Sequence, residues 1–310
     1  MNIVIIGNFS QRTELLIKGI FPREWKIAIV PPEKLDEVIA DAEVIIPEHV
    51  RIDGTFLDHA PKLKLVQTGA GFDNVDIEEC TKRGIYAANA VGINAITVAE
   101  HVMAYILCWY KNIIRLDGAM KRGDYDIDYI GSELSGKVIG IVGLGNIGRE
   151  VAQLAKALRM RILGCRLKSV ESGPEIEITD FRTLLQSSDV ITLHLYLSDQ
   201  TRGLISRREL GMMKTNALLI NTSRGPIIDE DALVWALQSR IIGGAALDVY
   251  EKEPLPKDSP LRKLDNIILT PHSAGMPDGL KFHRQRYEFF MENAKRVAEG
   301  KPPVSVLNKL

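Results

Sequence analysis

The chain is short of cysteine, of net charge and of long apolar runs, and each shortage excludes a class of protein. Its three cysteines among 310 residues are far apart and form no Cys-x-x-Cys pair, which argues against a disulfide framework and fits a reducing compartment. With 39 basic and 40 acidic residues the net charge is −1, so no overall field favours nucleic acid or an anionic membrane as a partner. No stretch approaches the roughly 18 uncharged apolar residues that a membrane helix requires.

The N-terminal segment does not have the features of a signal peptide. Residues 1–7 read Met-Asn-Ile-Val-Ile-Ile-Gly, which is the pattern of a short buried strand. Neither a basic region nor a cleavage site accompanies it. We therefore expect a cytoplasmic protein.

The order of the apolar segments predicts an α/β protein with two doubly wound parallel-sheet domains, because strands alternate with helices in both halves. In the first half we expect strands at 3–6, 26–30, 44–46, 63–67 and 85–87, and helices at 12–19, 34–40 and 77–83. In the second half a long helix over 95–122 precedes strands at 138–142, 161–165, 190–193, 217–221, 244–247 and 267–269. Ser206 and Glu209 form a capping-box pattern, which predicts a short helix. A last helix over 279–299 would split the first domain if it docks there.

The segment 138–158 carries the strongest nucleotide-binding signal. An apolar strand runs into Gly143-Leu144-Gly145-Asn146-Ile147-Gly148, and an amphipathic helical pattern follows. In such a turn Gly143 permits the tight bend, Gly145 lets the backbone approach phosphates, and Gly148 lets helix and strand pack closely. The pyrophosphate would lie at the helix start, at Asn146 and Ile147, where the helix dipole favours negative charge. Glycine triplets also make plain turns, but the strand before and the helix after favour a dinucleotide.

An acidic residue is missing where NAD-binding domains usually hold the ribose, about 20 residues past the glycines. The second strand of this block is followed by Arg166-Leu167-Lys168-Ser169. A carboxylate would repel a 2′-phosphate, whereas a guanidinium and an ammonium attract one. The alternative is a solvated basic loop. We favour recognition of the phosphate by Arg166 and Lys168, and hence NADP as the preferred coenzyme with NAD possible.

Three chemically distinct groups follow neighbouring strands near the end of the nucleotide block. Arg224 follows one strand, the acidic segment 248–254 with Glu251 and Glu253 follows the next, and His272 follows the last. A 2-oxo acid reductase needs such a set, because a cation binds the carboxylate, a proton donor serves the ketone oxygen, and a carboxylate keeps the donor protonated. Taken singly, a turn arginine or a loop histidine is usually a polar surface residue. Together they favour chemistry at this edge of the sheet.

With these motifs the chain resembles the D-isomer-specific 2-hydroxyacid dehydrogenase family, which includes phosphoglycerate, glyoxylate/hydroxypyruvate and phosphite dehydrogenases. The resemblance covers nearly the whole length through motifs in family order: Gly69–Asp76, Thr97–His101, Gly131–Leu134, Gly136-Lys137, the glycine turn and the three segments above. It implies a Rossmann nucleotide domain over 95–276 inserted into a flavodoxin-like substrate-binding domain over 1–94 and 277–310. It also implies a homodimer formed through the nucleotide domain.

The resemblance implies roles for individual residues. In the family the arginine of Asn-Thr-Ser-Arg-Gly binds the substrate carboxylate and carbonyl, the histidine of Pro-His is the acid/base, and the glutamate before proline pairs with it. These correspond to Arg224, to His272, and to Glu253 rather than Glu251. Residues implied to bind substrate through backbone N–H groups are Gly69, Ala70 and Gly71. Residues implied to lie near the nicotinamide are Asp248, Val98, Thr222 and Ser223.

Other polar residues are less diagnostic. We interpret Asn74, Glu100 and His101 as structural, and His194 as packing beside the coenzyme. Tyr196 stands where the family usually has proline. His49 or Arg51 could contact the distal group of the substrate, but solvated loop positions are the simpler interpretation.

We therefore expect an NAD(P)-dependent D-2-hydroxyacid dehydrogenase that transfers a hydride between NAD(P)H and a small 2-oxo acid, without a metal. A phosphite dehydrogenase would use the same three residues, but that branch has a lysine where this chain has Ala70. A formate dehydrogenase usually has glutamine in place of Glu253. A nucleotide-sensing interaction protein, like the family's transcriptional corepressors, also remains open, although no added recognition segment supports it.

Overall fold

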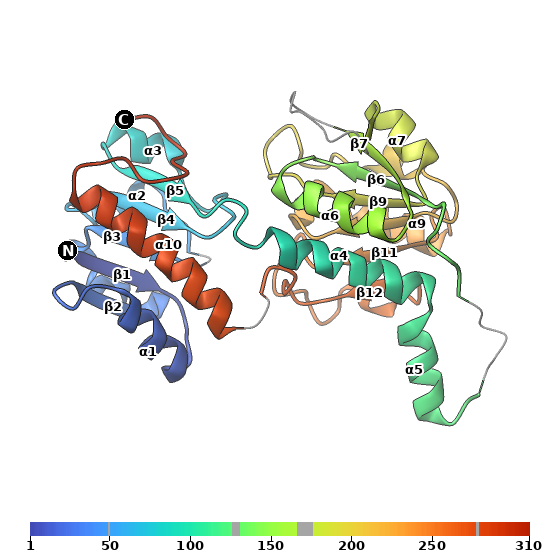
Figure 1. Cartoon of the computed structure of the whole chain (residues 1–310), viewed down its shortest axis with the longest axis horizontal. Coiled ribbons are helices and arrows are strands. Elements are labelled where there is room, and N and C mark those ends of the chain that lie inside the picture. The colour runs from blue at the N-terminus through green and yellow to red at the C-terminus, as the bar shows by residue number, and fades with distance from the viewer. Residues whose placement is uncertain (49, 126–130, 166–175, 277–278) are drawn as a thin grey trace. The chain divides into compact units, whose positions relative to one another are not determined.

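Two parallel sheets organise the chain (Figure 1). The computed structural model describes residues 1–48, 50–125, 131–165, 176–276 and 279–310. The chain divides into two compact units, the first formed by Met1–Ile93 with Met276–Leu310 and the second by Asn94–Gly275. The second unit is therefore an insertion between the two pieces of the first.

The first unit contains a five-stranded sheet in the order β2-β1-β3-β4-β5, and every neighbouring pair is parallel. This order is that of flavodoxin-like folds, whose ligands bind where the strand order reverses, here between β1 and β3. The strands are β1 (Asn2–Ile6), β2 (Lys26–Val30), β3 (Val44–Pro47), β4 (Leu65–Thr68) and β5 (Tyr86–Asn89).

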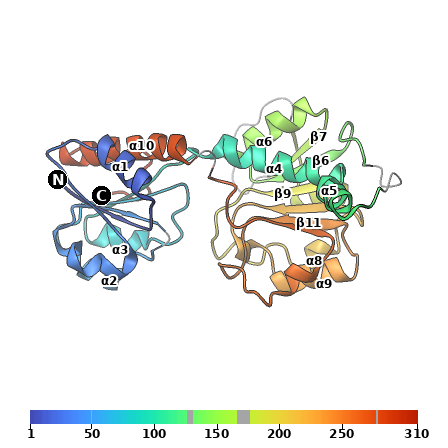
Figure 2. The same ribbon diagram turned by 90° about the horizontal axis from the view of Figure 1, so that it is seen from below.

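Helices cover both faces of this sheet (Figure 2). One face packs on α1 (Gln11–Ile20) and α10 (Leu280–Ala298), the other on α2 (Gly54–Asp58) and α3 (Ile77–Lys82). Side chains alternate between the faces because the strand period is two. Ile3 and Ile5 join the core with Tyr287 of α10, while Val4 and Ile6 join the opposite core.

The second unit contains a seven-stranded parallel sheet in the order β12-β11-β10-β9-β6-β7-β8. The six strands β6 to β11 have the spatial order of dinucleotide-binding domains, which reverses between β6 and β9. The strands are β6 (Val138–Val142), β7 (Arg161–Cys165), β8 (Glu177–Ile178), β9 (Val190–Leu193), β10 (Leu218–Asn221), β11 (Gly244–Leu247) and β12 (Ile267–Leu269). The predicted fold class of two doubly wound parallel sheets is confirmed.

The helices of the second unit also form two layers. One core contains residues of α4 (Ala95–Tyr110) and α6 (Asn146–Ala157), and the other contains residues of α7 (Phe181–Ser187), α8 (Arg207–Leu210) and α9 (Glu230–Gln238). The predicted capping box is confirmed, since Ser206 and Glu209 each bond the other's backbone at the start of α8. Short 3₁₀ turns complete the unit: η3 (Gly225–Ile227) and η4 (Pro260–Lys263).

Two predicted helices were wrong in their details. The expected helix over 95–122 is two helices, α4 and α5 (Ile113–Arg122), because Asn112 adopts a left-handed conformation with φ of +52°, which asparagine tolerates better than most residues. The segment 34–40 forms two 3₁₀ turns, η1 (Pro32–Glu37) and η2 (Ile39–Asp41). No residue of η1 or α5 is fully buried, although Leu35 of η1 packs partly buried against the core of the first unit. Among the described ranges, every helix is too short or too polar to cross a lipid bilayer.

Candidate active site

The glycine turn between β6 and α6 shows which of its glycines the protein itself requires. Gly143 has φ of +97°, and a Cβ there would lie 2.2 Å from the His194 carbonyl oxygen. A Cβ on Gly148 would lie 2.1 Å from the carbonyl oxygen of Gly143. Gly145 differs, because it is exposed and no atom of the described chain lies within 4 Å of its Cβ position. Packing therefore explains two glycines, and the third leaves open backbone for a ligand.

The start of α6 fits the pyrophosphate of a dinucleotide. Gly145 is its N-cap, no side chain of the described residues caps the first turn, and that turn holds no acidic residue. The backbone N–H groups of Asn146 and Ile147 lie in this turn, where the helix dipole favours an anion. Arg166 and Lys168, which we predict to contact a 2′-phosphate, lie outside the described residues. The preference for NADP therefore stays a prediction.

Arg224 lies in a turn that Asn221 holds from inside the protein. The Asn221 Nδ2 group donates to the Arg224 carbonyl oxygen at 2.9 Å, and its Oδ1 atom accepts from the Ser223 N–H at 3.0 Å. Ser223 Oγ in turn donates to the carbonyl oxygen of Leu193 at 2.5 Å. The oxygen and the nitrogen of the Asn221 side-chain amide thus both fix the backbone that carries Arg224 after β10.

Asp248 organises the loop that carries His272. Its side chain is buried, with only 1% exposed, and its two oxygens accept from the backbone N–H groups of Ser273 and Ala274, each at 2.8 Å. The backbone carbonyl of Asp248 also accepts from the His272 N–H at 2.8 Å. The structure therefore uses the Asp248 carboxylate within the protein, and its predicted role near the nicotinamide is untested.

His272 and Glu253 are in direct contact. The His272 Nδ1 atom lies 2.6 Å from Glu253 Oε2, and both side chains remain about one-third exposed, at 37% and 35%. The Tyr250 N–H donates to the other oxygen, Glu253 Oε1, at 3.1 Å. Both oxygens of Glu253 are therefore engaged, one by the imidazole and one by the backbone.

The charges around Glu253 bring Arg224 into the same site. Burial alone would raise the pKa of the Glu253 carboxyl, but the His272 and Tyr250 hydrogen bonds and the nearby positive charges of His272 and Arg224 lower it overall. The carboxyl is therefore held ionised beside two potential cations. This arrangement places a guanidinium near a carboxylate–imidazole pair at one edge of the sheet.

The interior beside the glycine turn contains a histidine of a different kind. His194 follows β9, its Nε2 atom lies 3.0 Å from Thr192 Oγ1, and its Nδ1 atom is buried without a hydrogen-bond partner among the described residues. Burial lowers its pKa to about 3, so it is neutral at physiological pH. Thr222 Oγ1 is likewise buried and unpartnered within the described chain, and Val98 is 3% exposed. These are the residues that we expect to line the coenzyme pocket.

In the first unit, the backbone of the loop Gly69–Gly71 is oriented by hydrogen bonds to its carbonyls. The Ala90 N–H donates to the Gly69 carbonyl at 2.9 Å, and Asn89 Nδ2 donates to the Ala70 carbonyl at 2.9 Å. Because a trans peptide directs N–H opposite to C=O, the N–H groups of Ala70 and Gly71 point away from these partners. Neither donates to an acceptor among the described residues. Two adjacent N–H groups without an acceptor in the described chain are available to a ligand, and successive backbone N–H groups can bind an anion such as a carboxylate.

Other predicted residues have simple structural contacts. Asn74 donates through Nδ2 to the Val50 carbonyl at 2.7 Å, and His101 Nε2 lies 3.2 Å from Thr270 Oγ1. Arg51 is exposed and pairs with Asp53 at 3.4 Å, while Glu100 is exposed. His49 lies outside the described residues.

Two residues that the sequence motifs did not single out, Thr270 and Glu230, hydrogen-bond segments that carry the predicted site residues. Thr270, at the end of β12, hydrogen-bonds Asp248 and Tyr105 in addition to His101. Its position two residues before His272 was a signal that could have identified it. Glu230 accepts a hydrogen bond from the backbone N–H of Glu251, in the segment that contains Glu253. In the sequence it is an ordinary acidic residue of a helix first turn.

Comparisons with known proteins relate the chain to one enzyme family. Residues 103–274 match the family described as D-isomer specific 2-hydroxyacid dehydrogenase, NAD binding domain. A glyoxylate reductase of Thermofilum pendens is 40% identical over 269 residues, covering 84% of this chain and 79% of that protein. A D-3-phosphoglycerate dehydrogenase of Archaeoglobus fulgidus is 40% identical over 256 residues, covering 81% of this chain and 49% of that protein.

Solved structures share the whole fold. A D-lactate dehydrogenase of Aquifex aeolicus, in complex with NAD and lactic acid, superposes with a TM-score of 0.87 at 27% identity and covers 96% of both chains. An acyclic imino acid reductase in complex with NADPH and D-arginine superposes with a TM-score of 0.87 at 28% identity, covering 99% of this chain and 100% of that chain. The two structures hold different coenzymes on the same fold.

Proposed function

Since the chain belongs to the D-isomer specific 2-hydroxyacid dehydrogenase family, we propose that it reduces a small 2-oxo acid to the D-2-hydroxy acid with NAD(P)H, reversibly. The observation that carries the proposal is the 2.6 Å contact between His272 Nδ1 and Glu253 Oε2, beside Arg224 and on the same sheet as the glycine turn. An ordinary surface histidine has no need of such a partner: Glu253 contacts His272 through one carboxylate oxygen and accepts the Tyr250 N–H through the other.

The proposed roles follow from charge and reach. When the coenzyme is bound with its pyrophosphate at the glycine turn, its nicotinamide would supply the hydride for C2 of the oxo acid. Arg224 binds the substrate carboxylate and polarises the carbonyl through its planar guanidinium. His272 donates a proton to the oxygen as negative charge develops there, and Glu253 stabilises the charged imidazole before this transfer. In the oxidative direction His272 accepts that proton.

We assign the two units different tasks. The second unit, predicted as residues 95–276, binds the coenzyme, and the first unit, predicted as 1–94 and 277–310, binds substrate through the Ala70 and Gly71 N–H groups. Arg166 and Lys168 favour NADP. The glyoxylate reductases among the relatives make glyoxylate the first substrate to test.

We also propose that the enzyme is a cytoplasmic homodimer. Helix α5 buries none of its residues in the described chain and exposes Ile113, Ile114 and Met120, each about half accessible to solvent. A second copy would cover this apolar surface. None of the three cysteines forms a disulfide in the described chain, which suits a reducing compartment.

The test is a panel of glyoxylate, hydroxypyruvate and pyruvate, each assayed with NADPH and with NADH. We expect turnover of at least one oxo acid, with NADPH preferred. Absence of turnover with every oxo acid and both coenzymes would overturn the proposal. Oxidation of phosphite or formate instead would place the same residues in a different reaction.

A further inference from the structure

One carboxylate near the proposed catalytic residues has no role in the reaction described above. Glu230 is the first residue of α9, and its Oε2 atom accepts a hydrogen bond from the backbone N–H of Glu251 at 3.2 Å. Glu251 lies two positions before Glu253. The contact therefore attaches the start of a helix to the turn that carries the partner of His272.

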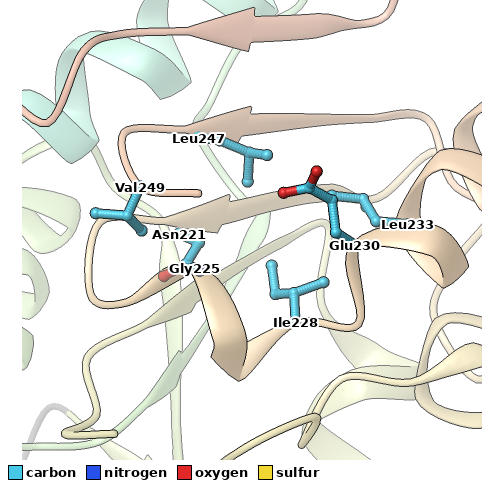
Figure 3. A pocket seen from close by; sticks show the side chains of 7 residues that line it. All are labelled: Asn221, Gly225, Ile228, Glu230, Leu233, Leu247 and Val249. Carbon is cyan, nitrogen blue, oxygen red and sulfur yellow. The ribbon is translucent and has the colours of Figure 1, made fainter. Parts of the chain in front are cut away.

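The Glu230 side chain lines a small pocket in largely apolar surroundings (Figure 3). The lining residues are Asn221, Gly225, Ile228, Glu230, Leu233, Leu247 and Val249. Burial raises the pKa of the Glu230 carboxyl, as do the negative charges of Glu251 and Asp231, while the Glu251 N–H lowers it. A carboxylate in such surroundings is costly unless it is hydrogen-bonded, and the solvent-exposed hydrogen bond from the Glu251 N–H offsets part of that cost.

The same pocket lies between the turns of two proposed catalytic residues. Asn221 and Gly225 belong to the turn of Arg224, and a Cβ on Gly225 would lie 1.9 Å from the Tyr250 backbone carbonyl. The two turns are therefore in direct backbone contact. Tyr250 in turn holds Glu253 through its N–H.

We propose that Glu230 is a positioning residue for the acid/base pair. It holds the backbone of residues 250–253 so that Glu253 contacts His272 and lies near Arg224. It does so because its side chain is long enough for Oε2 to accept the Glu251 N–H. This inference rests on the proposed function for its kinetic consequence, but the geometry that it describes can be tested without turnover.

Two substitutions separate the reach of the acceptor from its charge. Glu230→Gln keeps an oxygen at the same reach and removes the charge, whereas Glu230→Asp keeps the charge and shortens the side chain by roughly 1.5 Å. We expect Glu230→Gln to retain nearly wild-type kcat/KM. We expect Glu230→Asp to lose about three- to ten-fold, the size of one backbone hydrogen bond. Asp231→Asn is the control, since it removes an exposed charge from the same helix turn.

The pH dependence of oxo-acid reduction distinguishes positioning from a general loss of structure. A looser Glu253 stabilises the charged imidazole less, so in Glu230→Asp the alkaline fall in activity should move to lower pH. The dissociation constant for the coenzyme should stay at the wild-type value, because Glu230 does not line the glycine turn. Glu230→Gln and Asp231→Asn should match the wild type in both measurements.

An NMR titration of the His272 imidazole, assigned with a His272→Gln variant, reads the same geometry without any substrate. The titration midpoint should fall in Glu230→Asp and stay unchanged in Glu230→Gln. An unchanged midpoint in Glu230→Asp, or an equal change in both variants, would overturn the inference. If the wild type reduced no oxo acid while the midpoint still moved as expected, the proposed function would fail and the positioning role would stand.

Discussion

Each unit contains a carboxylate paired with a cation near the carboxyl end of its sheet, and the two pairs differ in what they can do. In the first unit Glu48, which follows β3, pairs with Arg286 of α10, and the two side chains are only 18% and 8% exposed. In the second unit Glu253 pairs with His272 at about one-third exposure. An arginine does not release its proton in proteins, whereas a histidine exchanges one near neutral pH.

The difference suits the Glu48–Arg286 pair to a structural role and the Glu253–His272 pair to the proposed proton transfer. Arg286 also lies beside the loop Gly69–Gly71, since its Nη2, Cζ and Nε atoms would be 3.7–3.8 Å from a Cβ on Gly69. Its charge is permanent and enclosed, so it stays paired with the Glu48 carboxylate. His272 remains accessible to substrate and to protons, so it can take part in a reaction.

The largest expected effect comes from breaking the buried pair. Arg286→Met leaves Glu48 as an uncompensated buried charge, and the free energy of unfolding should fall by about 3–5 kcal/mol. The double variant Glu48→Leu with Arg286→Met should recover most of that loss, because an apolar pair of similar volume needs no desolvation of charge. Urea unfolding of the three proteins measures both changes. Equal stability of the single variant and the wild type would mean that the pair is solvated.

Breaking the more exposed pair, Glu253 with His272, should affect catalysis more than stability. His272→Ala removes the proton donor, and kcat should fall about 100-fold or more, within the range of general acid catalysis, while coenzyme affinity changes little. Steady-state kinetics with the best oxo acid and a coenzyme titration check the two parts. A near-normal kcat would show that another group donates the proton.

The guanidinium beside this pair provides a test of geometry at constant charge. Arg224→Lys loses the planar fork, and binding of the oxo acid should weaken by roughly 1.5–3 kcal/mol, the range for charge-assisted hydrogen bonds. KM and kcat/KM for several oxo acids measure the loss. Wild-type kcat/KM for all of them would mean that a different residue holds the carboxylate.

Coenzyme choice is expected to depend on a comparable charge. Arg166→Asp removes one attraction for a 2′-phosphate and adds a repulsion, so NADPH affinity should fall by about 10- to 100-fold and the preference should turn to NADH. Added salt should weaken NADPH binding more than NADH binding in the wild type, since only NADPH carries the extra charge. Equal affinity of the wild type for both coenzymes at low salt would refute the NADP assignment.

The smallest effect distinguishes His194, which is buried, from His272, the proposed acid/base residue. The pKa of His194 is lowered to about 3 from an ordinary value of 6.5, so below that ordinary value the unfolded chain binds a proton that the folded chain does not. Stability should therefore fall as pH falls, by about 1.4 kcal/mol per pH unit from this residue. In His194→Gln the slope of unfolding free energy between pH 6 and about pH 4 should be smaller by that amount. Identical slopes would mean that His194 titrates normally.

Much of the fold could be predicted because its signals are local. The continuous apolar run of β6, which is buried along almost its whole length, and the conformation that Gly143 adopts are properties of short segments. The glycine turn, the capping box at Ser206 and most strands are found where expected. The break at Asn112 was not predicted, since the apolar helical pattern continues past it. Only the packing shows that α4 is covered and that α5 is not.

The candidate site divides in the same way. The sequence by itself determined that Arg224, an acidic segment and His272 follow neighbouring strands, because parallel strands bring their carboxyl ends to one edge. Tertiary structure decided that Thr270 hydrogen-bonds Asp248, that Glu230 accepts from the Glu251 N–H, and that Arg286 pairs with Glu48 across 238 positions of the chain. Hydrogen-bond partners so far apart depend on how helices and sheets pack, and no local pattern of residues encodes a distance between them.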